Sequence, residues 1–441
     1  MVSLAFLLCI AGALPAEAGL DVPLQRFVLR NGLTAILAPD HRLPLVAVEI
    51  AFRVGSRDEV KGRTGFAHLF EHLMFMGTKN VPGSQFDEIM EAEGGSNNAE
   101  TSEDRTVYYE QGPSPLLETF LWLEADRLSS LPEAMTKAKV DLQRSVVKDE
   151  RRSSYEVQPY GAVELLLPES LFALGHPYHH PVIGSHADLE AASVEDVKSF
   201  FRAHYVPSNA ALVIAGDFDP AEARRLVERY FAWMPRAPRP PRITPSDLPL
   251  EKPYKKALED AVELDQLTLA WRSPPELGPG SAETEVLAAV LGGQSSSRLR
   301  RALVEDRGVA QSVVVEQRGL DAGGSFVIRA TAQGGHDQAE LSSALDAELA
   351  RIFSEPPTPA EVDRAKAVLL GRALHAIEAP LGLAQQLAAY ELRFGDPWML
   401  TRSLTERYRH VEPSGVLEAA EILHGPRVTI TVTPKKKGGP R

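Results

Sequence analysis

A proline-rich segment near the middle of the chain limits the possible fold more than any other feature. Of the 441 residues, the 19 from Pro235 to Pro253 include seven prolines. Proline fixes the backbone angle φ and lacks an N–H group, so such a segment can neither continue a helix nor lie in the middle of a sheet. We therefore expect a stiff linker over residues 235–254, between one domain at 22–234 and a second at 255–434.

The two parts show a similar order of predicted elements, although their residues differ. In the first part the patterns predict a hairpin over Arg26–Leu37, strands at Leu45–Val54 and Ala210–Gly216, and helices at Thr64–Met76, Pro115–Leu131, Lys137–Tyr155 and Ala221–Phe231. In the second they predict strands at Leu267–Trp271, Ser312–Gln317, Ser325–Ala332 and Val428–Val432, and helices at Ala282–Leu291, Gln338–Phe353 and Pro359–Ala376. We expect an α+β fold of two similar domains, each a mostly antiparallel sheet with helices packed on one face.

The ends and the charge of the chain bear on location and partners. Residues 1–18 resemble a signal peptide, because the apolar run Leu4–Leu14 precedes the cleavage pattern at 16–18, although no Lys or Arg precedes that run. The expected location is therefore periplasmic or secreted. No other run is long enough for a membrane span, and 435–441 is predicted to be a basic tail. A net charge of −13 argues against a nucleic-acid partner.

The pentapeptide from His68 to His72 carries the clearest chemistry. It reads H-x-x-E-H, and on a helix it places His68 and His72 one turn apart on one face, as two ligands of a tetrahedral zinc site. Glu71 flanks these ligands and can take a proton from the attacking water. A second group of histidines, at 176, 179 and 180, is interpreted as a turn with exposed imidazoles rather than a metal site.

A catalytic zinc site needs a third protein ligand and an open fourth position. Spacing alone leaves several carboxylates as candidates, and rigidity favours those on the helix predicted for 137–155. The candidates are Glu100, Asp104, Glu124, Asp149 and Glu150, of which the last two lie on that helix.

Segments throughout the chain resemble the pitrilysin, insulinase and mitochondrial processing peptidase family, whose zinc motif is the inverted H-x-x-E-H. They are residues 65–78, 94–101 with Asp104, Thr106 and Tyr108, 146–152, 176–178, 183–184, 205–209, 292–293 and 296–299. The resemblance implies a zinc metalloendopeptidase that hydrolyses peptides or unfolded polypeptides. It implies one Zn²⁺ per chain held by His68, His72 and Glu150, with Glu71 as general base. It also implies that substrate pairs with a sheet edge at Asn98 and Ala99.

Two departures from the family pattern affect the expected assembly. Gln143 stands where many members have a second glutamate beside the metal ligands. The family often pairs an arginine with a tyrosine in the second domain to contact substrate; Arg298 is present, but Gln311 replaces the tyrosine. The chain thus resembles the zinc-carrying subunit of a bacterial two-chain enzyme, which implies a homologous partner chain. A homodimer is the simpler alternative, and a catalytically weak or inactive scaffold subunit is a second alternative function.

Overall fold

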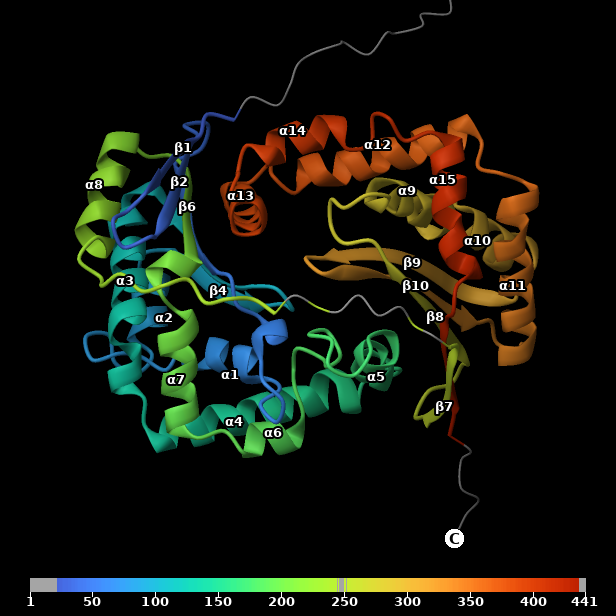
Figure 1. The fold of residues 1–441 in the computed structure, drawn as a ribbon, viewed down its shortest axis with the longest axis horizontal. Helices are drawn as coiled ribbons and strands as arrows, with labels where there is room; N and C mark the ends of the chain where they lie inside the picture. The colour runs from blue at the N-terminus through green and yellow to red at the C-terminus, as the bar shows by residue number, and fades with distance from the viewer. Residues whose placement is uncertain (1–21, 244, 246–249, 251, 436–441) are drawn as a thin grey trace, which may run out of the picture.

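The computed structural model describes residues 22–243, 245, 250 and 252–435, so the predicted signal peptide and all but the first residue of the basic tail lie outside the described residues. Two lobes, each built on one sheet, face each other across the middle of the molecule (Figure 1). The first contains strands β1 Gln25–Val28, β2 Thr34–Pro39, β3 Leu45–Phe52, β4 Ser96–Thr101, β5 Thr106–Pro113 and β6 Ala210–Gly216, with helices α1 Phe66–Leu73, α2 Gln85–Ala92, α3 Leu117–Ala134, α4 Lys137–Arg151, α5 Ala162–Leu171, α6 His186–Glu190, α7 Val194–His204 and α8 Pro220–Phe231.

The second lobe follows the proline-rich segment. It contains strands β7 Tyr254–Asp260, β8 Gln266–Ser273, β9 Ala310–Leu320, β10 Gly323–Ala332 and β11 Val428–Pro434, with helices α9 Ser281–Gly292, α10 Arg298–Arg300, α11 Gln338–Ser354, α12 Pro359–His375, α13 Pro380–Phe394, α14 Met399–Glu406 and α15 Pro413–Ala419. Among the described residues no single helix is long and apolar enough to cross a membrane; by length and composition only the pair α12 and α13, bent by 106°, passes the same test.

The two sheets share one topology. Their strand orders are β1-β2-β6-β3-β5-β4 and β7-β11-β8-β10-β9. If the extra edge strand β1 is set aside, each lobe places its first strand beside its last, and that pair is parallel while the others are antiparallel. The predicted α+β fold of two similar, mostly antiparallel domains is therefore confirmed.

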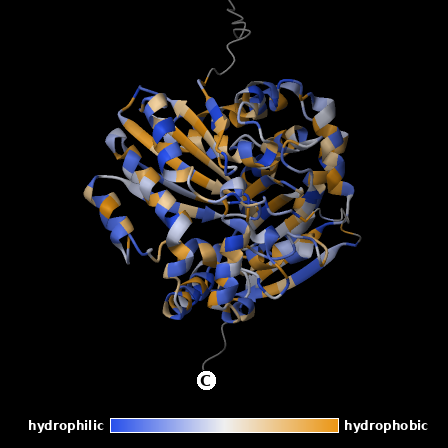
Figure 2. Cartoon of the chain, turned by 60° about the vertical axis from the view of Figure 1, so that its left-hand side comes forward, coloured by the Kyte–Doolittle hydropathy of each residue, from blue (hydrophilic) through white to orange (hydrophobic). Residues whose placement is uncertain are grey.

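Each sheet packs on helices of its own lobe through one face. In the first sheet, Val48 and Ile50 join a core with Phe120 of α3 and Leu69 of α1. In the second, Leu269 and Ile328 join a core with Leu345 of α11. The central strands are largely apolar (orange in Figure 2), because these sheets are covered on both faces.

The second face of each sheet is covered by a helix from the other lobe. Helix α13 packs Ala384 and Leu387 against Ala51 and Val213 of the first sheet. Helix α5 packs its apolar side chains against Ala270 of β8 and strands β10 and β11 of the second sheet. The sequence did not predict this exchange, because an apolar helix face does not specify which sheet it meets.

Candidate metal centre

The helix that carries the two histidines is fixed at its first residue. Gly65 precedes α1 with φ of +86°, and a Cβ there would lie 2.8 Å from the carbonyl oxygen of Ile183, so only glycine fits this turn. The buried carboxylate of Glu59 accepts hydrogen bonds from the N–H groups of Gly65 and Ala67, at 2.9 and 2.8 Å. This negative group at the helix N-terminus satisfies donors that the helix itself leaves unpaired.

Helix α4 carries Glu150 in its last turn and is braced against the same turn. Thr136 caps the start of α4 by accepting a hydrogen bond from the N–H of Lys139. At the other end Arg151 donates to the carbonyl of Gly184, at 2.6 Å, and Gly184 packs directly against Gly65. The start of one ligand helix and the end of the other are thus held at one point.

The structure brings His68, His72 and Glu150 together. The Nε2 atoms of His68 and His72 lie 3.7 and 3.2 Å from the two carboxylate oxygens of Glu150. One ligand atom from each residue lies within 4.8 Å of the others. Tetrahedral zinc with bonds of about 2.1 Å separates its ligand atoms by about 3.4 Å, which matches this spacing. Among the described residues this is the only such group of His, Cys, Asp and Glu side chains.

The electrostatics of the group suit a cation. Burial lowers the pKa of His68 to about 4, which keeps this imidazole neutral, as a metal ligand must be. Burial is the largest single influence on His72 and lowers its pKa, but the hydrogen bond with Glu150 and the charges of Glu150 and Glu71 together outweigh it, so the pKa of His72 is raised. The same hydrogen bond lowers the pKa of Glu150, so its carboxylate is ionised. Two imidazoles and one carboxylate are a donor set that zinc prefers.

Glu71 lies beside this group and is held by a residue that the sequence analysis missed. Its carboxylate interacts electrostatically with His72 and Glu150, and it accepts a short hydrogen bond from the hydroxyl of Thr101 at the end of β4. Burial raises the pKa of Glu71, and the bond from Thr101 opposes that rise. A hydroxyl close after the Asn98-Ala99 pair was visible in the sequence, but only the pairing of β4 with β5 and the contact of β4 with α1 give Thr101 its role.

The other four carboxylates proposed as third ligands have different surroundings. Glu124 is buried in an ion pair with Arg127. Asp149 is 72% exposed and pairs with Arg152. Asp104 is tied to residues of the second lobe, as described below, and Glu100 lines a cavity between the lobes. Only Glu150 approaches the two histidines.

The strand predicted to bind substrate is at the edge of its sheet. Strand β4 pairs with β5 on one side and ends the strand order on the other. Asn98 is exposed and Ala99 is half-buried on this strand, which contacts α1. An edge strand presents unpaired N–H and C=O groups to an added strand.

The structure does not bring Arg298 to the metal group. Its guanidinium donates to both carboxylate oxygens of Glu361, at 2.8 and 2.9 Å, and to the carbonyls of Glu355 and Pro356. This bond lowers the pKa of Glu361 to about 2. Arg298 therefore joins the end of α11 to the start of α12, and its expected contact with substrate stays a prediction. Gln311 is exposed at the start of β9.

Two other expectations concern residues near the ligand helices. Gln143, which replaces the family's second glutamate, hydrogen-bonds His72 and donates to the sulfur of Met76, at 2.7 Å, so it helps to hold a candidate ligand in place. The expectation of exposed imidazoles at 176–180 is wrong for His176, which is buried. His179 and His180 are half-buried, and they hydrogen-bond the carbonyl of Phe172 and the carboxylate of Glu59 respectively.

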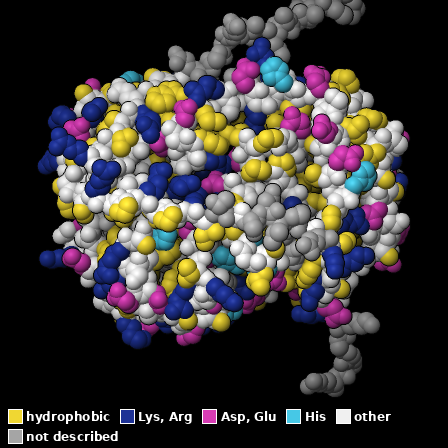
Figure 3. All heavy atoms as spheres, in the orientation of Figure 1, with side chains coloured by type: hydrophobic (Ala, Val, Ile, Leu, Met, Phe, Trp, Pro, Cys, Tyr) yellow, Lys and Arg dark blue, Asp and Glu magenta, His cyan; other side chains and the backbone are white. Residues whose placement is uncertain are grey.

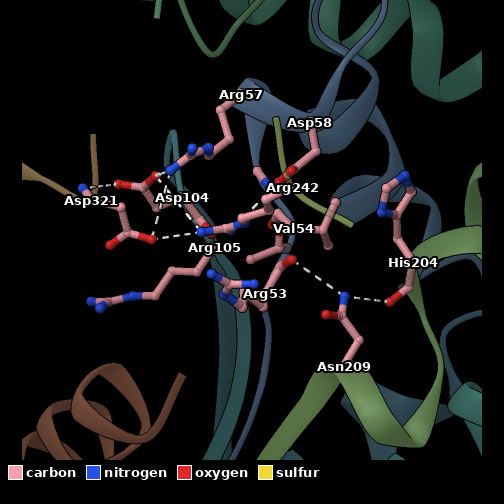
Figure 4. A network of polar contacts seen from close by, with 12 residues as sticks. Arg53, Val54, Arg57, Asp58, Asp104, Arg105, His204, Asn209, Arg242 and Asp321 are labelled. Atoms are coloured by element: carbon pink, nitrogen blue, oxygen red, sulfur yellow. Dashed lines mark hydrogen bonds and ion pairs between the residues drawn. The ribbon is translucent and has the colours of Figure 1, made fainter. Parts of the chain in front are cut away.

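The two lobes and the linker meet in a buried ion network beside the end of β4 (Figure 4). Asp104 accepts hydrogen bonds from Arg57 at 2.8 Å, from the hydroxyl of Tyr178 at 2.6 Å and from the N–H of Asp321 in the turn between β9 and β10 at 2.9 Å. Arg242 of the linker pairs with Asp321 at 2.6 Å. The network fixes the second lobe against the turn that follows the candidate substrate strand.

Comparisons with known proteins agree with this fold. The family model "Insulinase (Peptidase family M16)" matches residues 35–181, and the model "Peptidase M16 inactive domain" matches residues 191–369. The chain belongs to the M16 peptidase family.

Two relatives that are named as zinc proteases cover most of the chain. The zinc protease PqqE of Helicobacter pylori is 28% identical over 346 residues, which is 78% of this chain and 77% of that protein. An uncharacterized zinc protease of Streptomyces coelicolor is 27% identical over 430 residues, covering 92% of this chain and 89% of the relative.

Solved structures show the same fold. A protease from Helicobacter pylori has a TM-score of 0.86 and 25% identity, with 94% of this chain and all of that chain covered. The periplasmic protease PqqL from Escherichia coli has a TM-score of 0.75 and 21% identity, with 96% of this chain but only 48% of that chain covered.

Proposed function

We propose that this chain is a zinc-dependent metalloendopeptidase that hydrolyses peptides or unfolded polypeptides. The observation that carries the proposal is the convergence of His68, His72 and Glu150 from two braced helices, with Glu71 beside them. The names of the zinc proteases that it resembles support the same chemistry. Zinc, when bound by these three residues, supplies Lewis-acid chemistry that polarises a carbonyl and acidifies water.

The residues of the chain itself perform the proton transfers and the positioning. Glu71 takes a proton from the attacking water and delivers it to the leaving amine. Thr101 holds one oxygen of Glu71 and thereby orients the carboxylate. The peptide adds to the open edge of β4 at Asn98 and Ala99, where backbone pairing gives affinity without requiring one sequence.

The direct test is the substitution Glu71→Gln in the full chain. It removes the general base and leaves every proposed zinc ligand in place, so we expect kcat to fall by about 10³-fold with the zinc content unchanged. Peptide hydrolysis and metal analysis of the same sample measure both quantities. Unchanged hydrolysis would refute the proposed role of Glu71, and the absence of hydrolysis by the unaltered, zinc-loaded chain would favour an inactive scaffold subunit.

We further propose that the active assembly contains a second, homologous chain. The solved PqqL chain is about twice as long as the part that this chain covers, and its separately solved first half also has this fold. In this chain Gln311 and the engaged Arg298 leave the second lobe without the Arg/Tyr pair that the family resemblance implies. Hydrolysis that rises when a homologous chain is added would support this assembly, whereas a fully active homodimer would contradict it. The export proposed from residues 1–18 is tested by N-terminal sequencing of the mature protein.

A further inference from the structure

A cavity of about 520 Å³ lies between the two lobes, beyond the end of strand β4. Its wall combines Glu100 and Ser102 of the first lobe, Arg242 of the linker, and residues of α12, α13 and the turn between β9 and β10. Although the whole chain has a net charge of −13, seven arginines and four carboxylates line this cavity. They are Arg53, Arg105, Arg242, Arg318, Arg372, Arg393 and Arg407, with Glu100, Asp104, Glu276 and Asp321. Figure 3 shows Lys and Arg side chains gathered near the middle of this face of the molecule.

Most of the charged side chains that line the cavity pair with one another, but those without an oppositely charged partner are mostly arginines. Asp104, Glu276 and Asp321 are all engaged in ion pairs. Among the described residues, three lining arginines have no acidic partner within 4 Å, while only one lining carboxylate lacks a basic partner. The unpaired groups are Arg53, Arg105 and Arg372 on one side and Glu100 on the other.

Arg53 and Arg105 are direct neighbours. Strands β3 and β5 are antiparallel, and their register pairs Phe52 with Thr106, so Arg53 and Arg105 are the next residues opposite each other (Figure 4). Neither guanidinium forms a hydrogen bond within the described part of the chain, and Nε of Arg53 is buried without a partner. Burial lowers the pKa of Arg53, as does the nearby charge of Arg242. The positive charges that act on Arg53 come from Arg242, Arg239 and Arg57, and an anion bound beside Arg53 would offset them.

We propose that Arg53 and Arg105 form a subsite for a carboxylate of the peptide substrate, either an acidic side chain or the C-terminal carboxylate. Arginine presents a planar fork of donors that matches a carboxylate, and the cavity wall begins at Glu100 on the same strand that offers its edge to the peptide. A peptide that pairs with β4 and continues past Thr101 enters this cavity within a few residues of the scissile bond.

This subsite rests on the proposed peptidase function, so its test separates binding from turnover. The test uses a series of peptides that share one parent sequence. In each peptide a single position within four residues of the scissile bond carries Glu or Gln, and each peptide is made with a free and with an amidated C-terminus. Binding to the full-length Glu71→Gln chain is measured by fluorescence anisotropy, and kcat/KM is measured with the unaltered chain. We expect about tenfold tighter binding and higher kcat/KM for one acidic peptide than for its amide partner. The side-chain and C-terminal series identify which carboxylate is bound.

The variants Arg53→Gln, Arg105→Gln and the double variant should abolish this preference while hydrolysing the neutral peptide within about twofold of the unaltered rate. Arg30→Gln, an exposed residue outside the cavity, is the matched control and should keep the preference. Each single variant should unfold at about the same temperature as the unaltered chain or higher, since each removes a positive charge that has no acidic partner among the described residues. The subsite is overturned if the preference for the acidic peptide survives in the double variant, or if the unaltered chain shows no such preference. It is also overturned if both single variants unfold at a lower temperature than the unaltered chain. If the unaltered chain hydrolyses none of the peptides but the chain still binds the acidic peptide selectively, the peptidase function is contradicted and the subsite is not.

Discussion

The two lobes share a topology but differ in chemistry at a few equivalent positions. Helices α1 and α9 each follow a glycine with positive φ, Gly65 and Gly280. Counted from these glycines, His68, Glu71 and His72 correspond to Glu283, Val286 and Leu287, of which the last two are fully buried. Helices α4 and α12 each follow a capping threonine, and the fourteenth residue after it is Glu150 in the first and Arg372 in the second.

This difference shows how one fold supports a candidate metal centre in one lobe and a packed core in the other. The contacts between α1 and α4 have a counterpart in those between α9 and α12. Where the first lobe points imidazoles toward α4, the second buries apolar side chains. The fold supplies the arrangement of the two helices, and the side chains on them decide whether it can bind a metal.

The largest expected effect is the difference between two variants, one that removes a candidate zinc ligand in the first lobe and one that removes its counterpart in the second. His68→Ala should lose the zinc and about three orders of magnitude in kcat/KM, because carbonyl polarisation is worth several kcal/mol. Glu283→Ala, the matched position in the second lobe, should keep both. Metal analysis and peptide hydrolysis test the pair, and equal losses in the two variants would mean that the lobes are not chemically distinct.

The next effect concerns the network that joins the lobes. Asp104→Ala leaves the buried Arg57 without its closest carboxylate and should lower the free energy of unfolding by about 3 to 5 kcal/mol. Arg318→Gln breaks the pair with Glu103, in which the arginine is 57% exposed, and should cost less than about 1 kcal/mol. Urea denaturation measures the free energy of unfolding of both variants. Similar losses would show that the buried network stabilises the chain no more than an exposed ion pair does.

A buried acid beneath α13 makes the stability of the first lobe depend on pH. Burial raises the pKa of Glu49 on β3 to about 8 from its ordinary 4.5. The folded chain then holds a proton that the unfolded chain has released, so the free energy of unfolding falls as pH rises through this window. Glu49→Gln removes the titrating group and should stabilise the chain by up to about 3 kcal/mol at pH 8 but hardly at pH 5. Thermal unfolding at the two pH values checks this, and an equal effect at both would be inconsistent with a raised pKa.

The smallest predicted effect sharpens the role of β4. Thr101→Val keeps the shape of the side chain but removes the hydroxyl that holds Glu71, so kcat should fall about tenfold with KM nearly unchanged. Thr101→Ser restores a hydroxyl and should restore most of the rate. A valine variant as active as the unaltered chain would leave Thr101 with a purely structural role.

Much of the fold was predictable from local sequence patterns. The strand predicted at Ala210–Gly216 matches β6, and the helix predicted at Lys137–Tyr155 corresponds to α4 followed by a π-helical turn at Arg152–Glu156. The helix predicted over Thr64–Met76 is shorter in the structure: it begins only after Gly65, which has positive φ, and it ends at Leu73. The exchange of α5 and α13 between the lobes was not predictable, since it depends on contacts between distant segments.

The metal site was predictable only in part from the residues themselves. The spacing of His68 and His72 predicted two ligands on one helix face, but spacing left five carboxylates open as the third. The structure separates them, because an ion pair with Arg127 engages Glu124 and the lobe interface engages Asp104. The structural role of Arg298 was equally hidden, since Glu361 lies 63 residues away in the chain.

We propose that the first lobe binds a single zinc ion and the second binds none. Anomalous diffraction at the zinc edge, recorded from crystals of the full-length chain grown with zinc, tests this most directly. We predict one strong peak bounded by His68, His72 and Glu150 and no peak beside α9 and α12. A peak at Glu283 in the second lobe, or no peak between α1 and α4, would contradict it.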